Sequence, residues 1–297
     1  MRRIERLLSW IRTVKGEVAP QASAGTGRLA PRVTAALLSD PGPTRQANED
    51  CGRVMMTTRP DLADVEDVLA VVADGMGGHQ AGAVASRLAV EVVCRLFRGD
   101  AIDAGDSLRE AVIEANHAIY VLAGQNPELQ GMGTTCTALA IRPEGAYLAH
   151  VGDSRVYLLR DGALYQMTED HTAVMDLVRG GILTLDEARR HPQRNVLSRA
   201  VGRTEMATPD VWSAPIPICM GDRFVVCSDG LPDAVTETCI RDVLVALEPS
   251  AACQALIDEA WNRHAQDNVT VAVISIEPAV PVGAGRLPET REAEVAR

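Results

Sequence analysis

The 297-residue sequence is poor in aromatic side chains, which make up 3% of it, and it contains a single lysine, Lys15. Single-stranded nucleic acids are commonly bound by stacking bases on aromatic residues, so this composition argues against that function. The net charge of −11 points the same way, because an acidic protein repels a phosphate backbone. We therefore expect no nucleic-acid partner. An acidic protein that handles phosphate needs local positive charge, which a divalent metal ion can supply.

Long apolar runs are also missing, since no stretch approaches the roughly 18 residues of a membrane-spanning helix. Charged residues such as Arg2, Glu5 and Arg12 interrupt the region where a signal peptide needs an apolar core. The seven cysteines are scattered singly without a Cys-x-x-Cys pair, which is typical of buried thiols in a reducing compartment. We therefore predict a cytoplasmic protein without an integral membrane segment.

The ends of the chain differ from its middle. Residues 1–14 carry apolar side chains at helical spacing with basic residues opposite, and residues 16–31 are rich in Gly, Ala, Ser and Pro. We predict that residues 1–32 are an N-terminal extension, a short amphipathic helix followed by a flexible linker. The helix either docks on a membrane surface or a partner, or is a frayed tail, or packs on its own domain. The proline-containing, mixed-charge residues 277–297 are predicted to be a disordered tail.

The pattern of apolar residues over 33–276 predicts one domain, in which strands and helices occur in separate stretches of the sequence. Asp161 and Gly162 favour a tight hairpin turn between two strands. Helices segregated from antiparallel strands favour an α+β layered sandwich. The predicted strands are Val68–Ala73, Thr135–Ile141, Ala146–Val151, Arg155–Leu159, Phe224–Cys227 and Val269–Ile276, and the predicted helices are Gly82–Phe97, Leu108–Leu122, Leu185–Arg190 and Ala251–His264.

Acidic residues recur at the ends of these predicted strands. Asp74, Asp153 and Asp229 each follow an apolar run, and Asp267 immediately precedes one. A single Asp-Gly after a strand is usually a turn. Four carboxylates brought to one edge of a sandwich, however, would repel one another unless cations lay between them. Oxygen ligands without a zinc-like His/Cys spacing indicate Mg²⁺ or Mn²⁺.

The loop Arg45-Gln46-Ala47-Asn48-Glu49-Asp50 adds two acids and a guanidinium. A forked guanidinium suits bidentate binding of a phosphate oxyanion. The same loop also fits a polar surface segment that follows the turn at Pro41-Gly42-Pro43 and needs no partner. Composition alone leaves both interpretations open.

Seven short blocks occur in a characteristic order. They are Arg45–Asp50, Val72–His79, Gly133-Thr134-Thr135, Gly152-Asp153-Ser154-Arg155, Thr168-Glu169-Asp170-His171, Ser228-Asp229-Gly230-Leu231 and Asp267-Asn268-Val269-Thr270. Together they resemble the PP2C-like (PPM) metal-dependent protein serine/threonine phosphatases in their compact bacterial form, over residues 33–276. The resemblance implies an α+β fold, a four-layer α-β-β-α sandwich of two antiparallel sheets flanked by helices.

The resemblance also implies two Mn²⁺ or Mg²⁺ ions per subunit. Asp74 would bridge them, assisted by the carbonyl of Gly75, and Arg45 would bind the substrate phosphate. The remaining implied ligands are Asp229 and Asp267 for one ion, Glu49 for the other, Asp50 through a metal-bound water, and Asp153 with Asp229 for a third ion found in bacterial members.

The implied reaction is hydrolysis of phosphoserine or phosphothreonine in proteins by a metal-bridging hydroxide that attacks phosphorus in line. The partners would be phosphorylated proteins, a bacterial Ser/Thr kinase and its substrates. Residues 168–202 resemble the bacterial flap and are expected to border the substrate groove. The proton donor to the leaving group stays open, because Met76 stands where many relatives have His and His79 follows only three residues later.

Other phosphate chemistries fit less well. Cys136 and Arg142 have the Cys-x5-Arg spacing of cysteine-dependent phosphatases, but the residues between them predict a strand and include no glycine for a phosphate loop. A partner-switching phosphatase of the same fold would usually lack the Arg45 block and the flap. A pseudophosphatase that serves as a binding module would lose metal-binding acids, and a nucleotidase would need a base-recognition feature.

Overall fold

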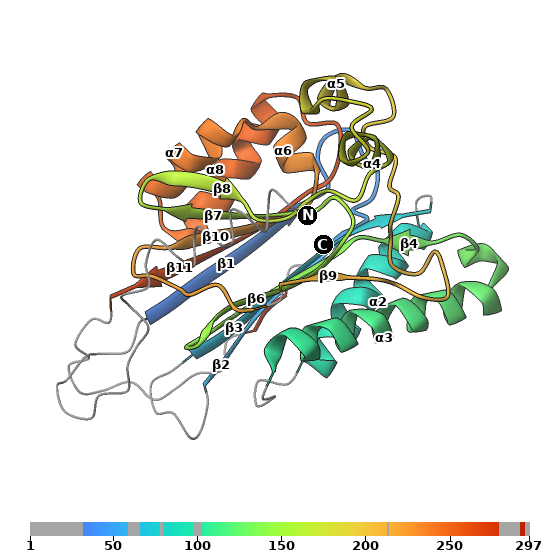
Figure 1. Ribbon diagram of the computed structural model, residues 1–297, viewed down its shortest axis with the longest axis horizontal. Coiled ribbons are helices and arrows are strands. Elements are labelled where there is room, and N and C mark those ends of the chain that lie inside the picture. Colours follow the sequence, from blue (N-terminus) through green and yellow to red (C-terminus); the bar gives the residue numbers. More distant parts are fainter. Residues whose placement is uncertain are drawn as a thin grey trace.

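Two antiparallel sheets lie face to face between two layers of helices in the computed structural model, which describes residues 32–58, 66–77, 80–97, 103–212, 214–278 and 292–294 (Figure 1). This arrangement confirms the predicted α+β sandwich of four layers. None of the described helices is long and apolar enough to span a bilayer.

The first sheet has five strands in the order β1-β11-β10-β7-β8, and neighbouring strands are antiparallel throughout. Its strands are β1 (Arg32–Asp40), β11 (Val269–Glu277), β10 (Arg223–Cys227), β7 (Arg155–Arg160) and β8 (Ala163–Gln166). The hairpin between β7 and β8 turns at Asp161 and Gly162, which both have positive φ angles, 53° and 76°. The predicted turn is therefore confirmed.

The second sheet has seven strands, with the path β12-β2-β3-β5-β6-β9 and β4 added beside the end of β3. Its strands are β12 (Glu292–Glu294), β2 (Asp50–Thr58), β3 (Glu66–Met76), β4 (Gly133–Thr134), β5 (Cys136–Arg142), β6 (Gly145–Val151) and β9 (Asp210–Val211). β12 lies inside the segment predicted to be a disordered tail, so the expectation differs from the structure at those three residues.

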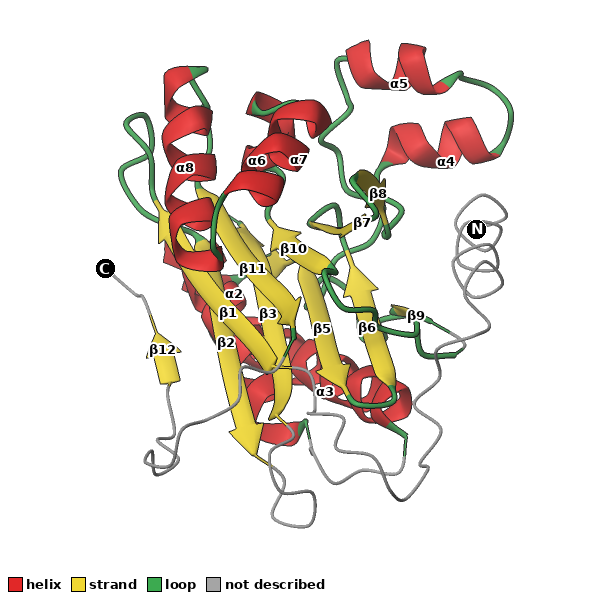
Figure 2. Cartoon of the chain, turned by 90° about the vertical axis from the view of Figure 1, so that its left-hand side faces the viewer, coloured by secondary structure: helices red, strands yellow, loops and turns green. Residues whose placement is uncertain are grey.

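Helices cover the outer face of each sheet. α2 (Gln80–Leu96) and α3 (Ala104–Gln125) pack on the second sheet, and a 3-10 turn (Pro127–Leu129) follows α3. α6 (Gly230–Ala234), α7 (Glu237–Ala246) and α8 (Pro249–Asn262) pack on the first sheet. α4 (Ala173–Arg179) and α5 (Leu185–Arg190) stand outside the two sheets (Figure 2).

The alternation of side chains along β3 explains why the sandwich needs four layers. Val68, Ala70 and Val72 belong to the core between the two sheets. Leu69 and Val71 point the other way, into the core beneath α2 and α3. A strand that is apolar on both faces is stable only when both faces are covered, here by a sheet and by helices.

Most predicted elements occur with boundaries within a few residues, and α5 has the predicted bounds. The flap prediction was wrong in one respect. Residues 168–202 contain a second helix, α4, which begins after Thr172, whose hydroxyl accepts a hydrogen bond from the N–H of Met175. The predicted N-terminal extension lies outside the described residues except for Arg32, which begins β1.

Candidate metal centre and substrate cleft

The end of β3 places Asp74 at the middle of the site. In the sheet register Asp74 pairs with Asp50 of β2, so two predicted ligands are direct neighbours. On the other side, the Asp74 N–H donates to Oγ1 of Thr135 (2.8 Å). The Asp74 carbonyl accepts from the Thr135 N–H (2.8 Å) and from Oγ1 of Thr134 (2.9 Å). The backbone of Asp74 is therefore held from both sides.

Gly75 is required here by close contact between backbones. A Cβ atom at this position would lie 2.2 Å from the carbonyl oxygen of Gly82 in α2 and 2.6 Å from that of Glu49. The Gly75 N–H donates to the Glu49 carbonyl at 3.1 Å, and Oγ of Ser86 donates to the same oxygen at 2.6 Å. The tight approach therefore brings Glu49 and the end of β3 together.

Asp50 joins the two sheets at this end of the sandwich. Its Oδ2 accepts hydrogen bonds from Oγ of Ser228 (2.7 Å) and Oγ1 of Thr270 (2.8 Å), both from the first sheet's side. Its Oδ1 is buried and accepts no hydrogen bond from any described residue. Burial raises the pKa of Asp50 to about 7, against the effect of these two hydroxyl donors.

Asp229 and Asp153 approach Asp74 from neighbouring loops. The carboxyl groups of Asp229 and Asp74 lie within hydrogen-bonding reach of each other, and Oδ1 of Asp229 is buried without a described partner. Asp153 is 7% exposed and follows β6. Its loop is tied to the end of β3, because Oγ of the adjacent Ser154 lies 2.7 Å from Oγ1 of Thr135.

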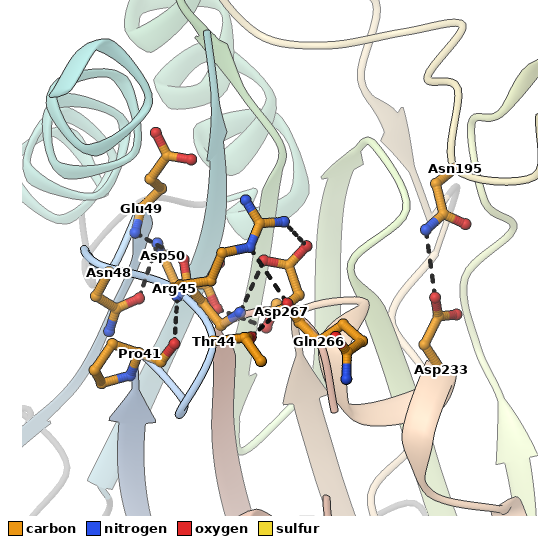
Figure 3. Close-up of polar contacts among 12 residues, drawn as sticks. Pro41, Thr44, Arg45, Asn48, Glu49, Asp50, Asn195, Asp233, Gln266 and Asp267 are labelled. Atoms are coloured by element: carbon orange, nitrogen blue, oxygen red, sulfur yellow. Dashed lines mark hydrogen bonds and ion pairs between the residues drawn. The ribbon is translucent and has the colours of Figure 1, made fainter. Parts of the chain in front are cut away.

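Arg45 and Asp267 form the rim of the site on the side of β11 (Figure 3). Nη2 of Arg45 lies 2.6 Å from Oδ2 of Asp267, and both side chains are about half exposed. Nε of Arg45 also donates to the carbonyl of Gln266 at 3.4 Å, and Oγ1 of Thr44 donates to that same oxygen at 3.0 Å. The loop that carries Arg45 is thus fixed to the turn before β11.

Burial and mutual repulsion between carboxylates dominate the electrostatics of the site. Burial raises the pKa of Asp229 to about 6, and burial together with the charges of Asp50 and Asp229 raises the pKa of Asp74 well above its ordinary value. Burial and the neighbouring Asp229 and Asp170 do the same for Asp153. Ionised carboxylates in such a place are stabilised by a bound cation.

This donor set fits hard divalent ions. The buried oxygens of Asp50 and Asp229 that accept no hydrogen bond from a described residue suit a nearby cation, and Mg²⁺ and Mn²⁺ favour oxygen ligands. In the described part of the chain, no three His, Cys, Asp or Glu side chains already converge as a preformed metal cage. The carboxylates are therefore gathered around the site and would adjust to an ion.

A cleft of about 1150 Å³ opens above these residues. The predicted site residues that line it are Arg45, Glu49, Asp74, Gly75, Asp153, Asp229 and Asp267, while Asp50 is buried beneath them. The opposite wall comes from residues 195–200 at the end of the predicted flap and from the segment that follows it. The structure thus brings the predicted site residues together at one end of the sandwich.

The polar residues that hold the acids in place were not among the predicted site residues. Thr135, Ser228 and Thr270 supply the hydroxyl groups described above. Asn268 accepts from the Glu49 N–H (2.9 Å) and donates to the carbonyls of Pro41 (2.8 Å) and Ala47 (3.1 Å). Each of these residues belongs to one of the seven sequence blocks described above. Their position near the acids was the only feature of the sequence that could have indicated their role.

Cys136 and Arg142 are the two ends of the buried strand β5, as predicted, and not parts of a phosphate loop. Burial raises the pKa of the Cys136 thiol to about 12, which disfavours a nucleophilic thiolate. Met76 ends β3 and lines the cleft. His79, the other residue considered as a proton donor, lies outside the described residues.

Known proteins are similar to this chain over most of its length. The family model described as protein phosphatase 2C matches residues 61–272. The serine/threonine protein phosphatase PstP of Mycobacterium tuberculosis is 42% identical over 212 residues, which are 70% of this chain but only 40% of PstP. The serine/threonine phosphatase stp of Listeria monocytogenes is 35% identical over 242 residues, covering 80% of this chain and 93% of that one.

Solved structures show the same fold. A serine/threonine phosphatase of S. agalactiae superposes with a TM-score of 0.74 at 35% identity, covering 83% of this chain and 100% of that one. The catalytic domain of PstP in complex with two manganese ions gives a TM-score of 0.69 at 36% identity, covering 82% and 98%. The fold is that of serine/threonine protein phosphatases. The chain belongs to the protein phosphatase 2C family.

Proposed function

We propose that this protein hydrolyses phosphoserine and phosphothreonine in other proteins, with two Mn²⁺ or Mg²⁺ ions held by Asp74, Gly75, Asp229, Asp267 and Glu49. Asp50 would act through a metal-bound water, and Asp153 would help to hold a third ion. The observation that carries the proposal is that Asp229 in the floor of the cleft, and Asp50 beneath it, each have a buried carboxylate oxygen that accepts no hydrogen bond from a described residue, in a cleft that also contains a guanidinium. When bound, the ions would supply positive charge and Lewis acidity for attack of water on phosphorus.

The chain's own residues would position the reactants. The backbone of Asp74 is held by Thr134 and Thr135, which fixes the point from which its carboxylate extends into the cleft. Arg45 can present two parallel N–H groups to the equatorial oxygens of the phosphate once it leaves Asp267. The flap side of the cleft would shield the phosphoryl group from bulk water. No side-chain nucleophile is needed, so the reaction would proceed without a covalent enzyme intermediate.

The same proposal includes the partners. The cleft is open to solvent and has a volume of about 1150 Å³, which suits part of a phosphorylated protein as substrate. A bacterial Ser/Thr kinase and its targets are the partners inferred from the family resemblance. A cytoplasmic location rests on the sequence features described above.

Phosphate release from a phosphothreonine peptide tests the proposal. We expect activity with millimolar Mn²⁺ or Mg²⁺ and none with EDTA. Asp229→Asn should lower kcat at least about 100-fold, because it removes a ligand charge at the cleft floor. Asp258→Asn, the same chemical change on the exposed face of α8, should retain wild-type activity. Equal activity in the presence of Mn²⁺ and of EDTA would contradict the metal-dependent mechanism.

A further inference from the structure

Arg203 differs from the other arginines of the cleft in having no acidic partner among the residues that the structure describes. In the described part of the chain, the arginines that line the cleft are Arg45, Arg199 and Arg203. Arg45 is paired with Asp267 (2.6 Å) and Arg199 with Asp210 (2.7 Å). Arg203 donates from Nη1 to the carbonyl of Gly131 at 2.8 Å, and among the described residues it has no carboxylate within ion-pair distance. Its other N–H groups can therefore bind an anion.

The segment that carries Arg203 is held in place next to the metal-binding end of β3. Val201 and Thr134 exchange two backbone hydrogen bonds, at 2.8 and 3.0 Å. The buried Asn116 accepts from the Gly202 N–H (2.7 Å) and donates to the carbonyls of Thr204 and Glu205 (both 3.1 Å). Arg203 therefore projects from a fixed backbone, which lowers the entropic cost of binding a ligand.

The aliphatic part of the Arg203 side chain lies directly on Gly133. A Cβ atom on Gly133 would lie 2.8 Å from Cγ and 2.9 Å from Cδ of Arg203. Gly133 pairs with Met76 across β4 and β3, two residues beyond Asp74. Paired Cα atoms in antiparallel strands are about 4.5–5.5 Å apart, so Arg203 stands beside the cleft floor. Arg45 stands on the opposite side, next to β11.

We infer that Arg203 binds a second anionic group of the substrate, a carboxylate or a second phosphate within a few residues of the phosphate being hydrolysed. A guanidinium can bind either group through two N–H bonds. Exposed apolar side chains on the same wall, Val196 at 50% and Met206 at 82% exposure, offer contacts for the rest of the peptide. The inference rests on the proposed phosphatase activity and assigns it a substrate preference.

A charge-reversal experiment tests this assignment. Three phosphothreonine peptides of equal length would carry flanking glutamates, a second phosphothreonine, or flanking lysines. For wild-type protein with Mn²⁺, we expect kcat/KM to favour the two acidic peptides over the lysine peptide. Arg203→Glu should shift the acidic-to-basic ratio of kcat/KM roughly 5- to 20-fold toward the lysine peptide, mostly through KM. Arg203→Gln should give an intermediate ratio.

The ratio of kcat/KM between peptides is compared within each variant. A general loss of folding or metal binding lowers kcat/KM for all three peptides equally and leaves this ratio unchanged. Arg241→Glu is the matched control, since it makes the same charge change on α7, where Arg241 contacts Asp242 outside the cleft. The glutamate and double-phosphate peptides distinguish the two sources of the anion. Equal ratios for Arg203→Glu and Arg241→Glu would overturn the assignment. Absence of wild-type activity on all three peptides would instead contradict the proposed function on which the assignment rests.

Discussion

Nη2 of Arg45 lies 2.6 Å from Oδ2 of Asp267, so the cation expected to bind substrate phosphate is paired with a carboxylate expected to bind metal. Both side chains are about half exposed, and an ion pair of this kind contributes only about 0–1 kcal/mol. The pair is therefore weak enough to be exchanged. An ion that binds Asp267 would compete with Arg45 and release its guanidinium toward the cleft.

This relationship predicts opposite effects of one substitution. Arg45→Ala should raise KM or lower kcat/KM for a phosphothreonine peptide about 10- to 100-fold, because a charge-assisted bidentate contact with phosphate is lost. The same change should leave Mn²⁺ affinity equal or up to about fivefold tighter, because a competitor for Asp267 is removed. Peptide kinetics and calorimetric titration with Mn²⁺ measure the two effects. Arg45→Lys keeps the charge, and its kcat/KM should lie between those of wild type and Arg45→Ala. Weaker Mn²⁺ binding by Arg45→Ala than by wild type would contradict the exchange of Asp267 between Arg45 and the ion.

The raised pKa of Asp50 makes a prediction about the metal-free protein. Because burial raises this pKa to about 7, the folded state keeps a proton that the unfolded state loses near pH 4. The contribution of Asp50 to stability is therefore lost as pH rises from about 4 to 7. Relative to Asp50→Asn, EDTA-treated wild type should become less stable by about 2–4 kcal/mol across this range.

Denaturant unfolding of both proteins at pH 4, 5.5 and 7 measures this difference. Mn²⁺ should reduce it at pH 7, because a cation near the carboxylates stabilises their ionised forms. A difference that stays constant with pH in EDTA would show that Asp50 titrates normally.

The end of β3 predicts a strong steric effect. Gly75→Ala should destabilise the protein by more than about 3 kcal/mol, because the new Cβ would lie 2.2 Å from a backbone oxygen of α2 that cannot rotate away. Gly124→Ala is the control, since nothing lies within 4 Å of a Cβ there and the residue is in the last turn of α3. It should stabilise by up to about 1 kcal/mol. Thermal unfolding of both variants tests this contrast, and similar midpoints would contradict the close packing.

The layers, and the gathering of the acids at one end of the sandwich, could be predicted from the sequence because these depend on local patterns. Alternating Val and Ala residues in β3 and acids at strand ends are visible without the fold. The supporting contacts are different, because Ser228 and Thr270 reach Asp50 across 178 and 220 residues. Hydrogen bonds between residues so far apart cannot be predicted from spacing along the sequence. β1 and α4 were missed for a related reason: β1 has only an irregular burial pattern, and α4 is a seven-residue helix with a single buried residue, Val174.

A buried histidine behind the cleft predicts acid sensitivity of a different origin. Nε2 of His150 faces the carbonyl oxygen of Glu169 at 3.3 Å, and a carbonyl can only accept, so Nε2 carries the proton. Nδ1, 2.9 Å from Oγ1 of Thr137, must then accept from that hydroxyl. Burial and the neighbouring ring of His171 lower the pKa of His150 to about 3. The folded protein therefore holds this imidazole neutral.

Between about pH 6.5 and pH 3, His150 is protonated in the unfolded chain but stays neutral in the folded chain. Stability contributed by the neutral ring is present above about pH 6.5 and is lost as pH falls toward 3. His150→Gln can keep both hydrogen bonds, with its amide donating to Glu169 and its oxygen accepting from Thr137. Between pH 6 and 4, its unfolding free energy should therefore fall less steeply than that of wild type, by roughly 1–3 kcal/mol in total. Denaturant titrations at several pH values measure both slopes, and parallel slopes would show that His150 is not the acid-sensitive group.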